Sequence, residues 1–329
     1  ANISVTATFA SDLDITSYTL TYTAGTHGSI TGTTPQTVNE GDNGSAVTAV
    51  ADTGYHFTSW SDSSTSNPRT DTNVTGNISV TASFAINTYT VTFDGNGSDG
   101  GSTATQTLNY NTPTALTANG YTKTGYTFAG WATTSGGSVA YADTASYTIG
   151  AANTTLYAKW TINTYTVTFN KNGGDTEANP TTKTANYNGN VGTLPTAPTR
   201  SNYSFNGWNT ASNGSGTSFT ATTAVTSNIT VYAQWTINSY TLTYTAGANG
   251  SITGTTPQTV NHGSNGTEVT AVANSGYHFT SWSDSSTSNP RTDTNVTGNI
   301  SVTASFAINT YTVTFDGNGS DGGSTATQT

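Results

Sequence analysis

The chain has 329 residues and a formal net charge of −10, with only seven Lys and Arg residues and with neither Cys nor Met. The basic residues are scattered, which excludes the clustered positive charge that nucleic-acid binding or attraction to an anionic membrane surface requires. The lack of cysteine excludes disulfides, thiol nucleophiles and thiolate metal sites, and no apolar run approaches the length of a membrane span.

The sequence repeats with an offset of 222 residues. Residues 18–107 and 240–329 differ at only eight positions, and 54–107 recur unchanged as 276–329. Self-similarity at a fixed period predicts a tandem repeat architecture. The abundance of Thr, Ser, Gly and Asn is typical of disordered chains. Disorder is nevertheless disfavoured, because the 6 Trp, 18 Tyr and 11 Phe recur in register and disordered tracts are poor in aromatic residues.

Three shorter units, which we name modules A, B and C, lie within each period. Each opens with a Tyr-Thr-Leu/Val-Thr-Tyr/Phe strand, carries an aromatic signature that ends in Trp, and closes with an alternating strand. Period-2 alternation predicts half-buried β-strands, and the Asn-Gly clusters predict hairpin turns. The predicted divisions are 1–17 (end of a preceding A-type module plus linker), 18–88 (A), 89–164 (B), 165–239 (C), 240–310 (second A) and 311–329 (start of a second B). Because the chain begins at a closing strand and ends early in a module, we expect a segment of a longer protein.

The aromatic signature supplies the expected core of each module. In Tyr55–Phe57 the alternation directs Tyr and Phe inward and His56 outward, whereas Trp60 is out of phase, and a β-bulge or a turn would direct it into the core. No helical stripe of useful length occurs, and at most a short turn of helix is expected near Asp143–Ile149. The predicted core residues are Tyr55, Phe57, Trp60, Tyr126, Phe128, Trp131, Trp160, Tyr203, Phe205, Trp208, Trp235, Tyr277, Phe279 and Trp282.

Consecutive modules are joined by Ile-Asn-Thr or Ile-Asn-Ser, without a Gly, Pro or low-complexity spacer. Joints this short are expected to be stiff, with the isoleucine packed in the interface between modules. The longer linker at 11–17 is expected to bend more. The predicted joint isoleucines are Ile86, Ile162, Ile237 and Ile308.

One segment resembles the start of a calcium loop. Asp94, Asn96 and Asp99 supply oxygen side chains, but the segment lacks the Gly at the sixth position and the Glu at the twelfth that complete such a loop. We therefore favour a polar hairpin turn, and we predict no metal and no other cofactor.

A catalytic site is also disfavoured. His56 and Asp62 recur as His278 and Asp284, but no positioned nucleophile or oxyanion donor accompanies them. An isopeptide crosslink would need a buried lysine, and Lys159 alternates outward. We predict that the chain is not an enzyme.

Binding and modification remain open. The outward-facing Tyr157 and Tyr232 could stack on sugars, although cross-strand packing is the favoured interpretation. Dense N-x-Ser/Thr sequons leave surface glycosylation open.

These motifs in combination resemble the internalin-type B repeat, also called the Listeria–Bacteroides repeat. Modules B and C share its opening strand, its signatures that end at Trp131 and Trp208, and its closing strands that end at Trp160 and Trp235. The A modules resemble its divergent relative. The resemblance implies a small β-grasp-like module, strung in arrays on secreted and cell-surface bacterial proteins, and it implies no enzymatic activity.

The expected fold is mainly β: a tandem array of β-grasp-like β-sheet modules of about 70–75 residues that form an elongated rod. About 4.5 modules, each about 33 Å long, would span on the order of 150 Å. The expected function is the structural repeat region of a long secreted bacterial surface protein, either a stiff shaft or the building block of an extracellular filament. The expected partners are copies of the same chain. The alternative is an adhesin that contacts a host protein, a glycan or a neighbouring cell, but no exposed aromatic cluster restricted to one module marks it.

Overall fold

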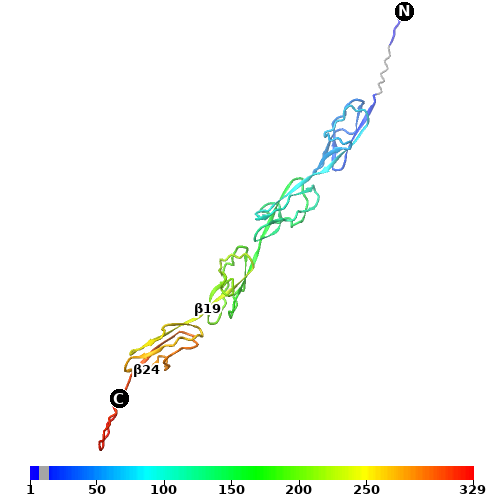
Figure 1. The fold of residues 1–329 in the computed structure, drawn as a ribbon. Coiled ribbons are helices and arrows are strands. Elements are labelled where there is room, and N and C mark those ends of the chain that lie inside the picture. Colours follow the sequence, from blue (N-terminus) through cyan, green and yellow to red (C-terminus); the bar gives the residue numbers. More distant parts are fainter. Residues whose placement is uncertain (7–14) are drawn as a thin grey trace. The chain divides into compact units, whose positions relative to one another are not determined.

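The computed structural model describes residues 1–6 and 15–329, and it divides into two compact units, 1–163 and 164–329. Among these residues the regular structure consists of β-strands, without a helix (Figure 1). The expected closing strand at 1–10 and the bend in the 11–17 linker lie partly outside the described residues. Each unit contains one A module and one other module, and each is built around mixed β-sheets.

Unit 1 begins with the first A module. Its strands are β1 (Ser17–Ala24), β2 (Gly28–Thr31), β3 (Gln36–Asn39), β4 (Thr48–Ala51), β5 (Tyr55–Trp60) and β6 (Ile78–Ile86). The main sheet has the order β3-β1-β6-β5, and β2 and β4 form a separate antiparallel pair. The first and last strands, β1 and β6, are parallel neighbours in the middle of the sheet, with antiparallel strands outside them.

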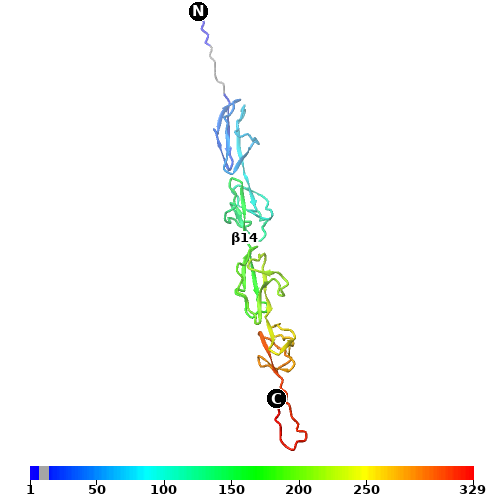
Figure 2. The ribbon, with the colours of Figure 1, turned by 90° about the vertical axis from the view of Figure 1, so that its left-hand side faces the viewer.

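Module B follows in the same unit. Its strands are β7 (Thr88–Asp94), β8 (Gly100–Gly101), β9 (Gln106–Asn109), β10 (Thr114–Ala115), β11 (Tyr121–Thr122), β12 (Tyr126–Ala132), β13 (Ser146–Tyr147) and β14 (Thr154–Ile162), of which β14 is labelled in Figure 2. The main sheet has the order β12-β14-β7-β9, and β8 pairs with β11 and β10 with β13. The turn of helix expected near Asp143–Ile149 is absent, because Tyr147 and Ile149 alternate inward as in a strand and are both buried.

Unit 2 contains module C and the second A module. The strands of module C are β15 (Thr164–Asn170), β16 (Thr182–Asn186), β17 (Tyr203–Asn209), β18 (Ser218–Phe219) and β19 (Ile229–Ile237), in the sheet order β16-β15-β19-β17-β18. The strands of the second A module are β20 (Ser239–Ala246), β21 (Gly250–Thr253), β22 (Gln258–Asn261), β23 (Thr270–Ala273), β24 (Tyr277–Trp282) and β25 (Ile300–Ile308), which repeat the topology of the first. Residues 311–329 contribute one isolated bridge, Val313 to Gln328.

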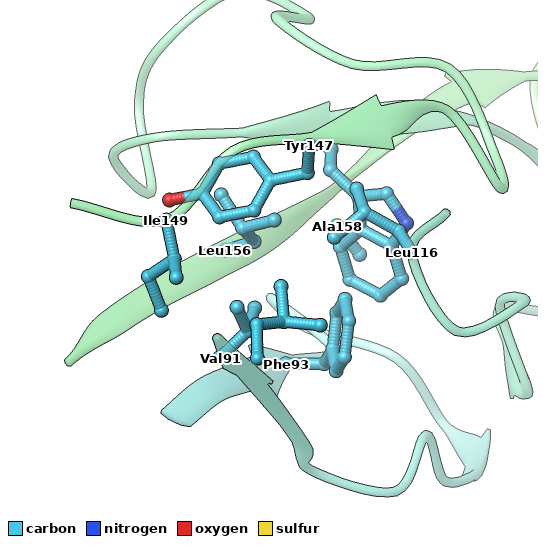
Figure 3. Close-up of a cluster of buried hydrophobic side chains, with 9 residues drawn as sticks. Val91, Phe93, Leu116, Tyr147, Ile149, Leu156 and Ala158 are labelled. Atoms are coloured by element: carbon cyan, nitrogen blue, oxygen red, sulfur yellow. The ribbon is translucent and has the colours of Figure 1, made fainter. Parts of the chain in front are cut away.

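Each module has a hydrophobic core of its own, with one buried Trp from the aromatic signature. Figure 3 shows the core of module B, where Val91 and Phe93 of β7 and Leu156 of β14 pack with Tyr147 and Ile149 from the segment between β12 and β14. The helix that a β-grasp module lays across its sheet is absent from the described residues. Loops take its place, joined by short two-stranded sheets in the A modules and module B, because the segments between the first and last strands lack a helical stripe.

Of the two alternatives for Trp60, a bulge or a turn, the structure shows the β-bulge, and the same irregularity recurs in the other three modules. The strand register shifts between Phe57 and Ser59, between Phe128 and Gly130, between Phe205 and Gly207, and between Phe279 and Ser281. The extra residue rotates the following Trp toward the core. Trp60, for example, is 1% exposed and lies 5.8 Å from the rings of both Phe57 and Tyr22.

Candidate functional site

The most specific contacts at the module ends are made by the asparagine of the Ile-Asn-Thr/Ser joint, which we call the joint asparagine. The joint asparagines are Asn87, Asn163, Asn238 and Asn309. Each backbone N–H donates to the carbonyl oxygen just before the aromatic signature: Gly54 at 2.8 Å, Gly125 at 2.9 Å, Asn202 at 2.9 Å and Gly276 at 2.8 Å. Each side-chain oxygen lies 2.6–2.8 Å from a polar atom of the signature strand, in His56, Thr127, Ser204 and His278. The joint asparagine is therefore fixed to the module that it leaves.

The joint asparagine is also bonded to the module that it enters. In unit 1 the carbonyl oxygen of Asn87 accepts the Tyr110 N–H at 2.9 Å, and in unit 2 that of Asn238 accepts the His262 N–H at 2.8 Å. In these two joints the asparagine between the strands therefore uses its backbone N–H, its backbone carbonyl oxygen and its side chain in hydrogen bonds. We had singled out the isoleucines of these joints and missed the asparagines, although their recurrence in all four joints was a visible signal.

A chain of aromatic rings crosses the joint between the first A module and module B. The Tyr110 ring lies 6.4 Å from both Tyr89 and Tyr55, and His27 stacks on Tyr55 at 4.0 Å. Gly54 lies beneath Tyr110 with a φ of +83°, and a Cβ atom there would come within 1.9 Å of the ring. Gly54 is therefore needed both for its left-handed backbone and for the approach of Tyr110.

The predicted core residues fall into three sets. The four tryptophans Trp60, Trp131, Trp208 and Trp282 are buried, whereas Trp160, Trp235, Phe57, Phe128, Phe205 and Phe279 are half-buried against the cores. The signature tyrosines Tyr55, Tyr126, Tyr203 and Tyr277 are half-buried at the joint end of their strands, which differs from the core position that we expected. The reason is the strand register, which pairs each of them with a joint isoleucine rather than with a core residue.

The joint isoleucines differ in exposure. Ile86, Ile162 and Ile237 are half-buried, and Ile308 is 64% exposed.

The three calcium candidates make structural contacts in module B. Asp94 accepts the Asn96 N–H at 2.7 Å, and Asp99 accepts the Thr124 N–H at 2.7 Å. Within residues 1–6 and 15–329, no group of three or more His, Cys, Asp or Glu residues is arranged to hold a metal ion. The expected polar hairpin turn is therefore replaced by two separate contacts: Asp94 closes the turn after β7, whereas Asp99 bonds to the segment between β11 and β12, and β8 pairs with β11 rather than with β7.

The asparagine of this turn has a second role that sequence reasoning missed. Asn96 and Asn172 occupy equivalent places with φ near +46° and +47°. Their side-chain amides donate to the carbonyl oxygens of Ser135 and Ala158 in module B, and of Ser212 and Ala233 in module C, at 2.7–2.9 Å. The Asn-Gly dipeptide signalled the turn, but only the fold shows that its side chain ties the turn to the closing strand.

The residues considered for catalysis, His56 and Asp62, bond to different partners and not to each other. His56 contacts Asn87, whereas Asp62 contacts Arg69 at 2.7 Å. Lys159 pairs opposite Gly130 in the sheet. The side chains that could stack on sugars, Tyr157 and Tyr232, are half-buried on their closing strands.

An ion cluster lies in the A modules. Arg69 is 6% exposed and donates to Asp71 at 2.7 and 2.8 Å, while its Nη1 lies 2.7 Å from Asp62. The Tyr22 hydroxyl donates to Asp71 at 2.7 Å, and the guanidinium lies 5.5 Å from the centre of the Trp60 ring. The second A module repeats this cluster with Arg291, Asp293, Asp284, Tyr244 and Trp282. The sequence analysis did not predict the ion cluster. Charged residues make up only 7% of the chain, and nothing in the sequence indicates that an arginine among them is buried.

The ion cluster predicts acid sensitivity in the A modules. Hydrogen bonds from Arg69 hold the pKa of Asp71 below its usual range, and Arg291 does the same for Asp293. A carboxyl whose pKa is lower in the folded than in the unfolded state stabilises the fold at pH values above its unfolded-state pKa. This stabilisation is lost as the pH falls through the folded-state pKa. We therefore expect the A modules to lose stability below about pH 4, measured by amide hydrogen exchange at stepwise lower pH.

Modules B and C provide the internal control for acid sensitivity. Their lowered carboxyl pKa values belong to Asp99 and Asp175, which accept hydrogen bonds at the surface. Solvent screens such surface interactions, so their loss matters less. Equal loss of protection in all four modules would contradict the assignment of acid sensitivity to the ion cluster.

The fold and the joints define the chain as a tandem array of small β-sheet repeats of two kinds, in which modules B and C, of one kind, lie between two A modules of the other. Residues 89–159 and 165–234 match the family model of the Listeria-Bacteroides repeat domain, and residues 18–88 and 240–310 match that of the divergent InlB B-repeat domain. These segments make up most of the chain. The chain therefore belongs to these B-repeat families, as its motifs predicted.

Two relatives come from Evansella cellulosilytica. One, named "Putative Gly-rich membrane protein", is 31% identical over 249 residues, which is 72% of this chain and 27% of the relative. The other, named "Putative membrane protein", is 29% identical over 171 residues, 51% of this chain and 25% of the relative. The matched parts thus span about a quarter of these relatives. No helix in residues 1–6 and 15–329 has the length and apolar character that a membrane crossing requires.

A solved structure of streptococcal high identity repeats in tandem (SHIRT) domains 3-4 from a cell surface protein covers 45% of this chain and 98% of its own. It is 15% identical to this chain, with a TM-score of 0.19. This similarity is too low to support a conclusion about the fold or the function of the chain.

Proposed function

We propose that this chain is the repeat region of a long bacterial surface protein, where it acts as a stiff extracellular shaft. The observation that carries the proposal is the joint. One asparagine separates the last strand of a module from the first strand of the next, and in each unit it is hydrogen-bonded to both modules. A linker with no free backbone donor or acceptor resists bending.

The sheet topology supports the same function. The first and last strands of every module are parallel neighbours, so the chain enters at one end of the sheet and leaves at the opposite end. Modules of this kind can be added in series without turning the chain back. Length would then be set by copy number, with each module keeping its own core.

An extracellular, non-enzymatic role is part of the proposal. The relatives are named as membrane proteins and are about four times as long as the matched segment, which leaves room in them for an anchor and further domains. The histidines and carboxylates that could serve catalysis take part in structural hydrogen bonds instead.

Small-angle X-ray scattering of the 329-residue chain tests the shaft. We expect a rod-like profile with a maximum dimension on the order of 150 Å, from about 33 Å per module. A broad distribution of lengths would refute stiff joints. As a control, replacing Asn87 and Asn238 with glycine removes the side-chain bonds and adds backbone freedom, which should broaden the distribution.

Electron cryo-microscopy of the native material distinguishes the shaft from the filament. Isolated single-chain threads are expected for a shaft. Ordered filaments with an axial repeat of one A-B-C set, held by contacts between chains, would instead assign this chain to a polymer.

A further inference from the structure

The parallel pair at the centre of each sheet has a consequence for a chain under tension. Tension draws the first strand toward its N-terminal end and the last strand toward its C-terminal end. Because the two strands run parallel side by side, they would have to slide past one another before the module could open. The hydrogen bonds of a parallel pair are evenly spaced along it, so the load falls on all of them together rather than on one at a time.

The register defines this pair in every module. In the first A module five residue pairs align, from Leu20–Ile78 to Ala24–Ala82, and the second A module repeats them. Modules B and C align four pairs each. The antiparallel strands lie outside this pair, so they are not the strands at which the chain enters and leaves.

An asparagine just before the last strand extends the pair by one further bond. These residues, which we call latch asparagines, are Asn77, Asn153, Asn228 and Asn299. Their side-chain oxygens accept the backbone N–H of Thr19, Thr90, Thr166 and Thr241, at 2.8, 2.8, 2.8 and 2.9 Å. The bond joins the first strand to the last strand near the end at which the first strand is loaded. It is present in all four modules, although the residues that precede the latch differ between A, B and C.

We propose that each module is a shear clamp that carries tension along the chain, and that the latch asparagine is part of this clamp. With such a clamp in every module, the shaft can bear tension along the chain without extending. The inference rests on the proposed function only in taking tension along the chain as the load. The clamp is a property of single modules, so it would survive a scattering result that showed flexible joints.

Pulling the 329-residue chain by its two ends at constant force tests the clamp. Four complete modules should give four unfolding steps, each releasing on the order of 200 Å of chain at about 3.3–3.6 Å per residue. In the double variant N77A/N299A, two of the four steps should become about fivefold faster, which corresponds to one hydrogen bond. The unchanged modules B and C serve as the standard in the same molecule.

The matched control removes the same kind of bond away from the clamp. Asn43 and Asn265 accept the backbone N–H of Asn73 and Asn295 at 2.9 Å, and these bonds join two loops. The variant N43A/N265A should leave all four steps at the parent rate, even where it lowers the melting temperature as much as N77A/N299A does. Equal acceleration by both variants, or none by N77A/N299A, would overturn the clamp.

The variant N77D/N299D tests whether the faster unfolding comes from loss of the latch hydrogen bond or from a general loss of folding. An aspartate keeps the acceptor oxygen for the Thr19 and Thr241 N–H groups, so its steps should stay within about twofold of the parent rate. If N77D/N299D accelerates unfolding as much as alanine does, the latch bond is not what holds the module and the role given to it is wrong.

Discussion

Replacing Arg69 with alanine is expected to destabilise the first A module by about 3–5 kcal/mol, because it leaves two carboxylates without their buried partner. Arg69 is 6% exposed, and it is bonded to Asp71 and Asp62. A small β module is marginally stable, so a loss of this size should leave it mostly unfolded. Module B and unit 2 keep their own cores and should remain folded.

The matched variant Arg291→Ala should unfold the second A module and spare the first. Amide hydrogen exchange measured by mass spectrometry follows both, because peptides from 40–53 and 262–275 differ in sequence and therefore in mass. As a control, Arg200→Ala removes an arginine that packs over Tyr203 at 3.8 Å outside any ion cluster, and it should cost about 1 kcal/mol or less. An effect of Arg69→Ala no larger than that of Arg200→Ala would show that the ion cluster contributes little to stability.

Replacing Gly54 with alanine is expected to displace the joint between the first A module and module B. Two effects combine at this position. The left-handed φ of +83° strains any residue with a Cβ by roughly 1–2 kcal/mol, and the Cβ would also collide with the Tyr110 ring at 1.9 Å. Because the Tyr110 ring belongs to module B and is held between Tyr55 and Tyr89, we expect the collision to be relieved by movement of one module against the other.

The chain contains its own control for this variant. Gly276 lies in an identical sequence with a φ of +85°, but nothing lies within 4 Å of the position of its Cβ. Gly276→Ala should therefore show the backbone strain without the displacement. The chain has no cysteine, so spin labels can be attached to single cysteines introduced at Ser29 and Thr105, and pulsed electron resonance gives the distance between the modules.

The expected result is a shifted or broadened distance distribution for Gly54→Ala. Gly276→Ala lies outside the two labelled modules, so it reports the backbone strain alone, through amide hydrogen exchange of the second A module. Adding Tyr110→Ala to Gly54→Ala should restore the parent position by removing the colliding ring. If the distance is unchanged in Gly54→Ala, the ring chain does not set the joint.

The strands and the bulge could be predicted because they depend on short-range order. The alternation in Tyr55–Phe57 and the phase of Trp60 fix which side chains face the core, whatever the strands pair with. The parallel pairing of β1 with β6 depends on contacts between residues 58 positions apart, and no local pattern encodes it. The alternation therefore predicted which segments form strands, but it did not predict the order of those strands in the sheet.

The roles of individual polar residues were harder to predict. Arg69 follows a proline in a polar loop, where a charged residue is normally exposed, and only the fold brings Asp71, Asp62 and Trp60 around it. The joint asparagine was visible as a repeated letter, but its three hydrogen bonds need the signature strand and the next module to be in place. Tyr55 alternates like a core residue and lies at the joint because the register pairs it with Ile86.

The pairing of first and last strands also bears on how repeats with identical sequences avoid misassembly. The segment 276–308 of the second A module is identical to 54–86 of the first, so β1 could in principle pair with β25 instead of β6. The correct partner is about 58 residues away, and the wrong one lies 222 residues further along the chain. Each doubling of the closed loop costs about 0.6 kcal/mol, so the swapped module is disfavoured by roughly 1–1.5 kcal/mol in loop closure. Modules B and C, which are dissimilar to A in sequence, thus separate the identical copies during synthesis, and each A module can close on itself before its duplicate emerges.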